Sequence, residues 1–146
     1  MDDLNIVVGP YSFIARLEMD AAPMTCKAFG RLLPLVNKVI HSRWSGEAVW
    51  VPLGDLDAGV GFENPTSHPA PGEILLYPGG LSETEILLPY GSVCFSSKVG
   101  QLAGNHFLTI TGGRDNLGAL GRLVLWHGAQ AIRIETARSV KPWPPT

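Results

Sequence analysis

The stretch GNHFLTIT, residues 104–111, places two adjacent polar side chains at the start of an apolar run. Asn105 can both donate and accept hydrogen bonds, and His106 exchanges a proton near neutral pH. The apolar residues that follow are typical of a β-strand, so we expect both side chains at the mouth of a strand. We therefore predict a site here, in which Asn105 binds a ligand and His106 is a general base. A packed histidine at a strand end is the structural alternative.

Glu63 and Asn64 lie in a segment rich in Gly, Pro, Asp and Asn, residues 54–72, which we expect to form a long loop. Loops of this length in a compact domain are usually functional. Glu63 is the predicted partner that orients His106, and together they form the candidate acid–base pair. Asn64 is a candidate ligand-binding residue, although an Asn before a Pro is also a common turn device.

Arg43 and Trp44 form a second candidate group. An arginine side chain binds a carboxylate through two parallel hydrogen bonds, and an indole ring offers a flat apolar wall. Tyr77 ends an apolar run and is a further candidate for a pocket wall. Structural roles are the alternatives, because Arg43 can pair with Glu47 four residues later. Tyrosines such as Tyr77 also commonly fill the end of a barrel.

Several kinds of site are not indicated by the sequence. The serines lack the Gly-x-Ser-x-Gly context of a hydrolase, and the paired glycines lack the pattern of a phosphate loop. No two histidines have the spacing of metal ligands, so we predict neither a metal site nor a cofactor. Cys26 and Cys94 also lack such a spacing, and we expect both to be buried free thiols.

Composition predicts one folded domain spanning residues 1–146, since 45% of the residues are hydrophobic and 16% are charged. The formal net charge of −2 and the lack of a basic stripe give no reason to expect nucleic-acid binding. The apolar runs are too short to cross a membrane, and the acidic start at Asp2 and Asp3 is unlike a signal peptide. We therefore expect a cytoplasmic protein with no membrane or nucleic-acid partner.

Short apolar or alternating runs predict a mainly β fold. The 17 glycines and 12 prolines, about a fifth of the chain, are typical of many turns between short strands. Helices are expected over residues 24–33, with Asp20 as cap and Pro34 as stop, and over residues 116–126. The remaining runs favour a closed, mostly antiparallel barrel of about eight strands capped by the two helices. The expected strands are residues 4–8, 12–19, 36–40, 48–51, 73–77, 85–88, 93–97, 105–111 and 131–136.

Two segments resemble cyclophilins. ARLEMDAAPMTCKAFGRLL, residues 15–33, resembles their opening strand, Asp-x-x-Pro-x-Thr turn and helix, and GNHFLTIT resembles their strand Gly-Ser-Gln-Phe-Phe-Ile-Thr. IHSR, residues 40–43, lies where cyclophilins carry Phe-His-Arg. With RWSGE, ENP and PGEILLYPG, the order of motifs resembles an uncharacterised bacterial cyclophilin-like family, a domain of unknown function distant from true cyclophilins.

This resemblance implies a cyclophilin-like, closed eight-stranded antiparallel β-barrel with two capping helices and a pocket on one side. In that pocket Arg43 would take the place of the isomerase arginine, while Asn105 and His106 would replace a Ser and a Gln. The cyclophilin segments Gly-Lys-His-Val-Val-Phe-Gly and Phe-Met-x-Gln-Gly-Gly-Asp have no counterpart here. Most of the aromatic residues that bind proline are therefore missing.

Three functions follow as hypotheses. The leading one is a pocket for a small anionic or amide-bearing molecule, with or without catalysis by His106 and Glu63. The second is peptidyl-prolyl isomerase activity. The third is a non-catalytic subunit or assembly module, in which exposed edge strands and the Pro-rich tail from Pro142 support association, including a homo-oligomer.

Overall fold

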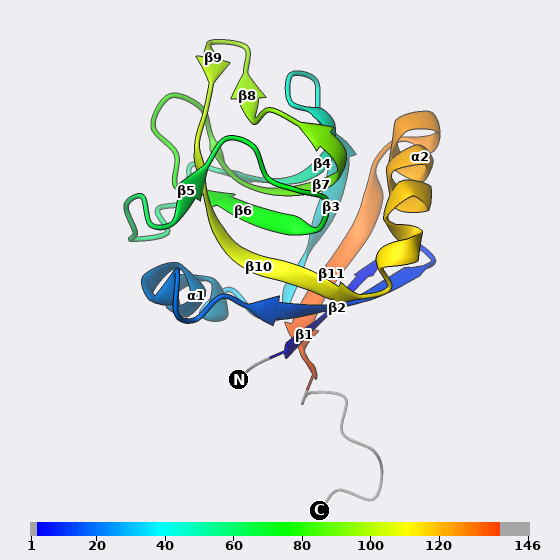
Figure 1. The fold of residues 1–146 in the computed structure, drawn as a ribbon, viewed down its shortest axis with the longest axis horizontal. Coiled ribbons are helices and arrows are strands. Elements are labelled where there is room, and N and C mark those ends of the chain that lie inside the picture. The colour runs from blue at the N-terminus through cyan, green and yellow to red at the C-terminus, as the bar shows by residue number, and fades with distance from the viewer. Residues whose placement is uncertain (1–2, 138–146) are drawn as a thin grey trace, which may run out of the picture.

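A computed structural model describes residues 3–137 and shows a closed β-barrel (Figure 1). Its strands form an antiparallel ring in the order β2-β1-β11-β3-β4-β7-β6-β10, and β10 pairs back onto β2. The predicted eight-stranded antiparallel barrel with two helices is confirmed. The ring consists of β1 (Asp3–Val8), β2 (Tyr11–Leu17), β3 (Leu35–His41), β4 (Gly46–Gly54), β6 (Glu73–Tyr77), β7 (Thr84–Val93), β10 (Gly104–Gly112) and β11 (Gln130–Thr136).

The strands bury side chains on both faces in the region of β4, β6 and β7. Because successive side chains of a strand point to opposite faces, Ile86 and Leu88 pack in the main core, whereas Leu87 belongs to a second buried cluster. Phe95 and Leu102, from the segment after β7, complete that second cluster. The same segment forms a hairpin of β8 (Ser96–Ser97) and β9 (Gly100–Gln101), at the top of Figure 1. This hairpin segment therefore covers part of the outer face of the barrel.

Two helices complete the fold. The helix α2 (Leu117–His127) follows the short 3₁₀ turn η1 (Arg114–Asn116) and ends before Gly128, which confirms the second predicted helix. The helix α1 (Pro23–Gly30) is shorter than the expected residues 24–33. Asp20 does not cap it, because Ala22 occupies the cap position and no side chain within the local turn binds the first N–H groups. The two helices contact different strands, α1 packing on β10 and α2 on β3, β4 and β7.

The expected strands 85–88 and 93–97 are wrong as two separate elements, since β7 runs without interruption from Thr84 to Val93. Pro89 and Gly91 suggest a break in the sequence, but Pro89 pairs with Ala48 beside an irregularity in the register. Proline is tolerated at such irregular positions of a sheet. The long loop after β4 contains a single short strand, β5 (Pro65–Thr66), which pairs with the start of β10.

Both cysteines are free, as expected, and Cys26 is buried; Cys94 is only half-buried, which differs from the expected burial of both. Within residues 3–137, no helix combines the length and the apolar character needed to span a membrane. The Pro-rich tail from Pro142 lies outside the described residues.

Candidate functional site

A cavity of about 640 Å³ lies against the outer face of the barrel, and we call it the outer cavity. Its walls come from the ends of β3 and β4, the loop between them, the loop before β7, the start of β7 and the β8–β9 hairpin. This volume falls within the range of roughly 300–1,000 Å³ that is typical of small-molecule sites. The charged and aromatic residues that line it include Arg43, Trp44, Trp50, Glu83, Glu85 and Lys98.

Arg43 and Trp44 are neighbours in the loop that joins β3 to β4, and both line the outer cavity. The loop is tied to the hairpin, because the Ser45 hydroxyl donates to the Ser96 carbonyl oxygen at 3.1 Å and accepts from the Ser96 N–H at 3.0 Å. The Trp44 side chain is 57% exposed. Across residues 3–137, no hydrogen bond or ion pair engages the Arg43 guanidinium. Both side chains are therefore free to contact a ligand.

Glu85 contributes a buried carboxyl group to the outer cavity. It lies near the start of β7, opposite Pro52 of β4 and Tyr77 of β6, and only 7% of its surface is exposed. Burial, and then the negative charge of Glu83, raise the pKa of Glu85 to about 8. No hydrogen bond or ion pair within the described chain reaches this carboxyl group. Its oxygen atoms nevertheless keep some solvent exposure, because no fully buried side-chain oxygen within residues 3–137 lacks a hydrogen-bond partner. A cavity-lining carboxyl group with a strongly raised pKa is a candidate functional residue.

His41 and Tyr90 fix the wall of the outer cavity nearest α2. The Nδ1 atom of His41 lies 2.9 Å from the Ser42 carbonyl oxygen and must donate to it, since that oxygen can only accept. In the neutral ring, its Nε2 atom then accepts a hydrogen bond from the Tyr90 hydroxyl at 2.8 Å. Tyr90 packs against Gly121 of α2, where an added Cβ would lie 2.3 Å from the ring. The helix thus holds Tyr90, and Tyr90 holds the His41 ring in the wall.

Asn105 and Glu63 meet at the N-terminus of α1, away from the residues that line the outer cavity. The Glu63 carboxylate accepts hydrogen bonds from the Met24 N–H at 3.2 Å, the Thr25 N–H at 2.8 Å and the Thr25 hydroxyl at 2.7 Å. Asn105 is fully buried, accepts from the Glu63 N–H at 2.9 Å and donates to the Thr25 hydroxyl and the Gly61 carbonyl oxygen. Glu63 therefore supplies the missing helix cap, and Asn105 holds it in place.

The hydrogen bonds also determine the ionisation of Glu63. Desolvation opposes its charged form, but the hydrogen bonds from the side chain and backbone of Thr25 and from the backbone of Met24 outweigh that effect. They hold the pKa of Glu63 below its ordinary value. Glu63 is thus a carboxylate at neutral pH, engaged by the helix.

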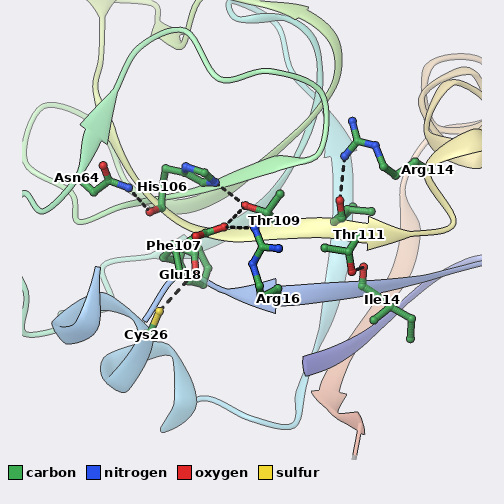
Figure 2. Close-up of polar contacts among 11 residues, drawn as sticks. Ile14, Arg16, Glu18, Cys26, Asn64, His106, Phe107, Thr109, Thr111 and Arg114 are labelled. Atoms are coloured by element: carbon green, nitrogen blue, oxygen red, sulfur yellow. Dashed lines mark hydrogen bonds and ion pairs between the residues drawn. The ribbon is translucent and has the colours of Figure 1, made fainter. Parts of the chain in front are cut away.

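His106 lies on β10, and Asn64 lies in the loop beside that strand (Figure 2). The Asn64 side-chain amide donates to the His106 carbonyl oxygen at 2.9 Å, and the His106 N–H donates to the Asn64 carbonyl oxygen at 3.1 Å. The Nε2 atom of His106 is 2.7 Å from the Thr109 hydroxyl, which in turn donates to the Glu18 carboxylate. Because that hydroxyl proton goes to Glu18, Nε2 of His106 is the donor to Thr109. Thr109 and Glu18 therefore orient His106.

Tyr77 stands behind the outer cavity. It is buried in β6, and its ring meets Phe95 edge to face with 5.7 Å between the ring centroids. Its hydroxyl accepts a hydrogen bond from the N–H of Leu81, a residue that lines the outer cavity. Tyr77 thus holds a residue of the cavity lining in place but does not itself line the cavity.

Among the predicted site residues, the structure brings Arg43 and Trp44 together at one cavity. It places His106, Asn64, Asn105 and Glu63 around α1 and β10. Glu85 was not predicted as a site residue, because it follows Glu83 and Thr84 at the polar start of the run and is expected there to be exposed. No local signal in the sequence marks its burial. Within residues 3–137, no three His, Cys, Asp or Glu side chains gather in a way that could hold a metal ion.

Comparisons with known proteins agree with the fold. The family described as "Protein of unknown function (DUF3830)" matches residues 4–136. No curated protein matches the chain. The structure of McbB in complex with tryptophan is 14% identical with a TM-score of 0.69, covering 95% of this chain and 46% of McbB, so this chain spans about half the length of McbB. The solution structure of the hypothetical protein AF2241 from Archaeoglobus fulgidus is 16% identical with a TM-score of 0.53, covering 93% of this chain and 95% of that one. At these identities the likeness shows the fold alone.

Proposed function

We propose that this chain, which belongs to the DUF3830 family of proteins of unknown function, binds a small carboxylate-bearing molecule in the outer cavity. The observation that carries the proposal is the position of Arg43 beside Trp44 in a cavity of about 640 Å³. The Arg43 guanidinium, unengaged within residues 3–137, can hold a carboxylate through two charge-assisted hydrogen bonds. Lys98, on the hairpin, adds a second positive charge to the lining.

Two tryptophans support an apolar body for the ligand. Trp44 from the β3–β4 loop and Trp50 from β4 both line the outer cavity, and indole rings offer large flat surfaces for aromatic or aliphatic groups. McbB, which shares the fold, is described in complex with tryptophan. That complex makes aromatic carboxylates suitable first probes for this chain.

We also propose that the barrel is cyclophilin-like. The proposal is supported by the eight-stranded ring with two helices, by the order of the motifs, and by Arg43 on the lining of a cavity at one side of the barrel. The acid–base role of His106 with Glu63, and the ligand-binding roles of Asn64 and Asn105, stay predictions. Self-association also stays a prediction.

A thermal-shift screen of small carboxylates and amides tests the proposed function. A carboxylate at one hundred times its Kd should stabilise the native state by about 2.7 kcal/mol, which corresponds to roughly 5–10 °C in Tm. Arg43→Ala should remove this rise, and Arg43→Lys should restore only part of it, because lysine cannot form the bidentate pair. Arg122→Ala, an exposed arginine of α2, is the matched control and should behave as wild type. Equal rises in wild type and Arg43→Ala would remove Arg43 from the site.

A further inference from the structure

The charges that line the outer cavity have two signs and come from different segments. Arg43 belongs to the β3–β4 loop and Lys98 to the β8–β9 hairpin, whereas Glu83 and Glu85 belong to the loop before β7 and to its start. Within residues 3–137, none of these side chains forms an ion pair with another. The lining therefore offers cationic and acidic groups that do not neutralise one another directly.

Glu85 is the less exposed of the two carboxyl groups in this lining. Glu83 is exposed, whereas Glu85 is 7% exposed and has no hydrogen bond to another described residue, although its oxygen atoms are not fully buried. Its carboxyl group lines the cavity, so a ligand entering the cavity can reach it. An ammonium group suits this position, because it donates hydrogen bonds and compensates the negative charge of an ionised carboxylate.

We propose that the outer cavity takes a zwitterionic ligand, whose ammonium group binds Glu85 and whose carboxylate binds Arg43. This assignment rests on the proposed function, in which Arg43 holds a carboxylate. The exposed Glu83 adds negative charge near the ammonium end. Lys98 and the His41 ring also line the cavity, but both ring nitrogens of His41 are already hydrogen-bonded to Ser42 and Tyr90.

The pairing register of β4 and β7 indicates how far apart Arg43 and Glu85 are, and the ligand must bridge that distance. Arg43 comes just before β4 begins at Gly46, whereas Glu85 pairs with Pro52 near the other end of β4. The backbone from Gly46 to Pro52 spans about 20 Å at about 3.3 Å for each residue, and the two long side chains shorten the gap. An extended tripeptide spans about 10 Å, and a single amino acid spans about a third of that. A free amino acid and a short peptide with free ends share the required chemistry, and the experiment separates them.

Burial predicts a proton release on binding. At pH 7 the empty cavity holds Glu85 mainly protonated, because its pKa is raised to about 8. An ammonium ion favours the ionised carboxylate, so the carboxyl proton leaves to solvent when the ligand binds. Isothermal titration calorimetry in buffers with different ionisation enthalpies measures this release.

Four probes test the proposal: L-tryptophan, Gly-Trp-Gly and the N-acetylated form of each. For at least one pair, acetylation should weaken binding to wild type about tenfold or more and abolish the proton release. In Glu85→Gln, the free and acetylated forms should bind within twofold of each other. Arg43→Ala should weaken both forms alike. Whichever of L-tryptophan and Gly-Trp-Gly binds more tightly identifies the source as a free amino acid or a short peptide.

Two results would overturn the proposal. Equal affinity of free and acetylated probes for wild type, with both still dependent on Arg43, would reject the zwitterion and keep the carboxylate site. Failure of all four probes to bind at millimolar concentration would reject the zwitterion, and if every carboxylate of the thermal-shift screen also failed to raise the Tm, the proposed function would be rejected with it. If Glu85→Gln does not fold, the ¹³C shift of the Glu85 carboxyl carbon in wild type decides, since it must move with the free probe and stay with the acetylated one.

Discussion

Replacing Glu85 with glutamine should change how the stability of the protein depends on pH. Glutamine has nearly the same shape as glutamic acid but cannot ionise, so it removes only the titration of this buried group. In the folded chain the pKa of Glu85 is raised from 4.5 to about 8 by burial and by the charge of Glu83. The folded state therefore holds the Glu85 proton more tightly than the unfolded state.

The sign and size of the effect follow from proton linkage. The stability due to the protonated Glu85 is complete below pH 4.5 and is lost as the pH rises through about 8. At about 1.4 kcal/mol for each pH unit between the two pKa values, the total loss is about 5 kcal/mol. Of this total, about 4 kcal/mol falls between pH 5 and pH 9. Glu85→Gln lacks this loss, so its stability relative to wild type should increase by that amount over the same interval.

Urea unfolding of wild type and Glu85→Gln from pH 5 to pH 9 measures the difference, with the midpoint and slope giving the free energy of unfolding. Glu83→Gln is the matched control, because Glu83 is exposed and lies two residues away. It should keep the wild-type profile with a small shift to lower pH, since it removes the repulsion that helps to keep Glu85 protonated. Parallel stability profiles for wild type and Glu85→Gln would refute the reasoning.

Three further predictions concern the groups around the site. Glu63→Gln should cost about 1 kcal/mol at pH 7, because it weakens the cap of α1, and the difference from wild type should shrink as the pH falls and Glu63 is protonated; urea unfolding at pH 7 and pH 3 measures both. Asn105→Ala should lower the free energy of unfolding by about 1–3 kcal/mol in the same measurement, since it leaves buried partners without hydrogen bonds. A decrease of less than half the lower figure would contradict the role of Asn105 in holding Glu63. Trp44→Ala should weaken a cavity ligand by about threefold to tenfold, whereas Trp126→Ala, at a position 76% exposed on α2, should leave the Kd unchanged in a titration.

Sequence periodicity predicted most of the barrel, because strand and helix patterns are local. The 3.6-residue period and Gly128 placed α2, and the apolar run of residues 73–77 gave β6 with its bounds. Local sequence patterns gave wrong strand bounds where contacts between residues distant in the sequence determine the structure. Pro89 and Gly91 suggested a break, but pairing with β4 carries β7 through that region.

The candidate site was predicted in part for the same reason. Arg43 and Trp44 are adjacent in the sequence, so their joint position in one loop needed no tertiary information. Glu63 caps a helix 38 residues away in the sequence, a contact that no local pattern announces. Glu85 follows polar residues in the sequence, and its burial in the folded chain is a tertiary property that no local pattern indicates.

The most direct test of the site compares Arg43→Ala with His106→Ala. Isothermal titration calorimetry should use the carboxylate that raises the wild-type Tm most. A charge-assisted bidentate contact contributes about 1.5–3 kcal/mol, so Arg43→Ala should weaken binding by about tenfold to a hundredfold, while His106→Ala should stay within twofold of wild type. Binding that survives Arg43→Ala and is lost in His106→Ala would contradict the outer cavity as the site and place the ligand at β10.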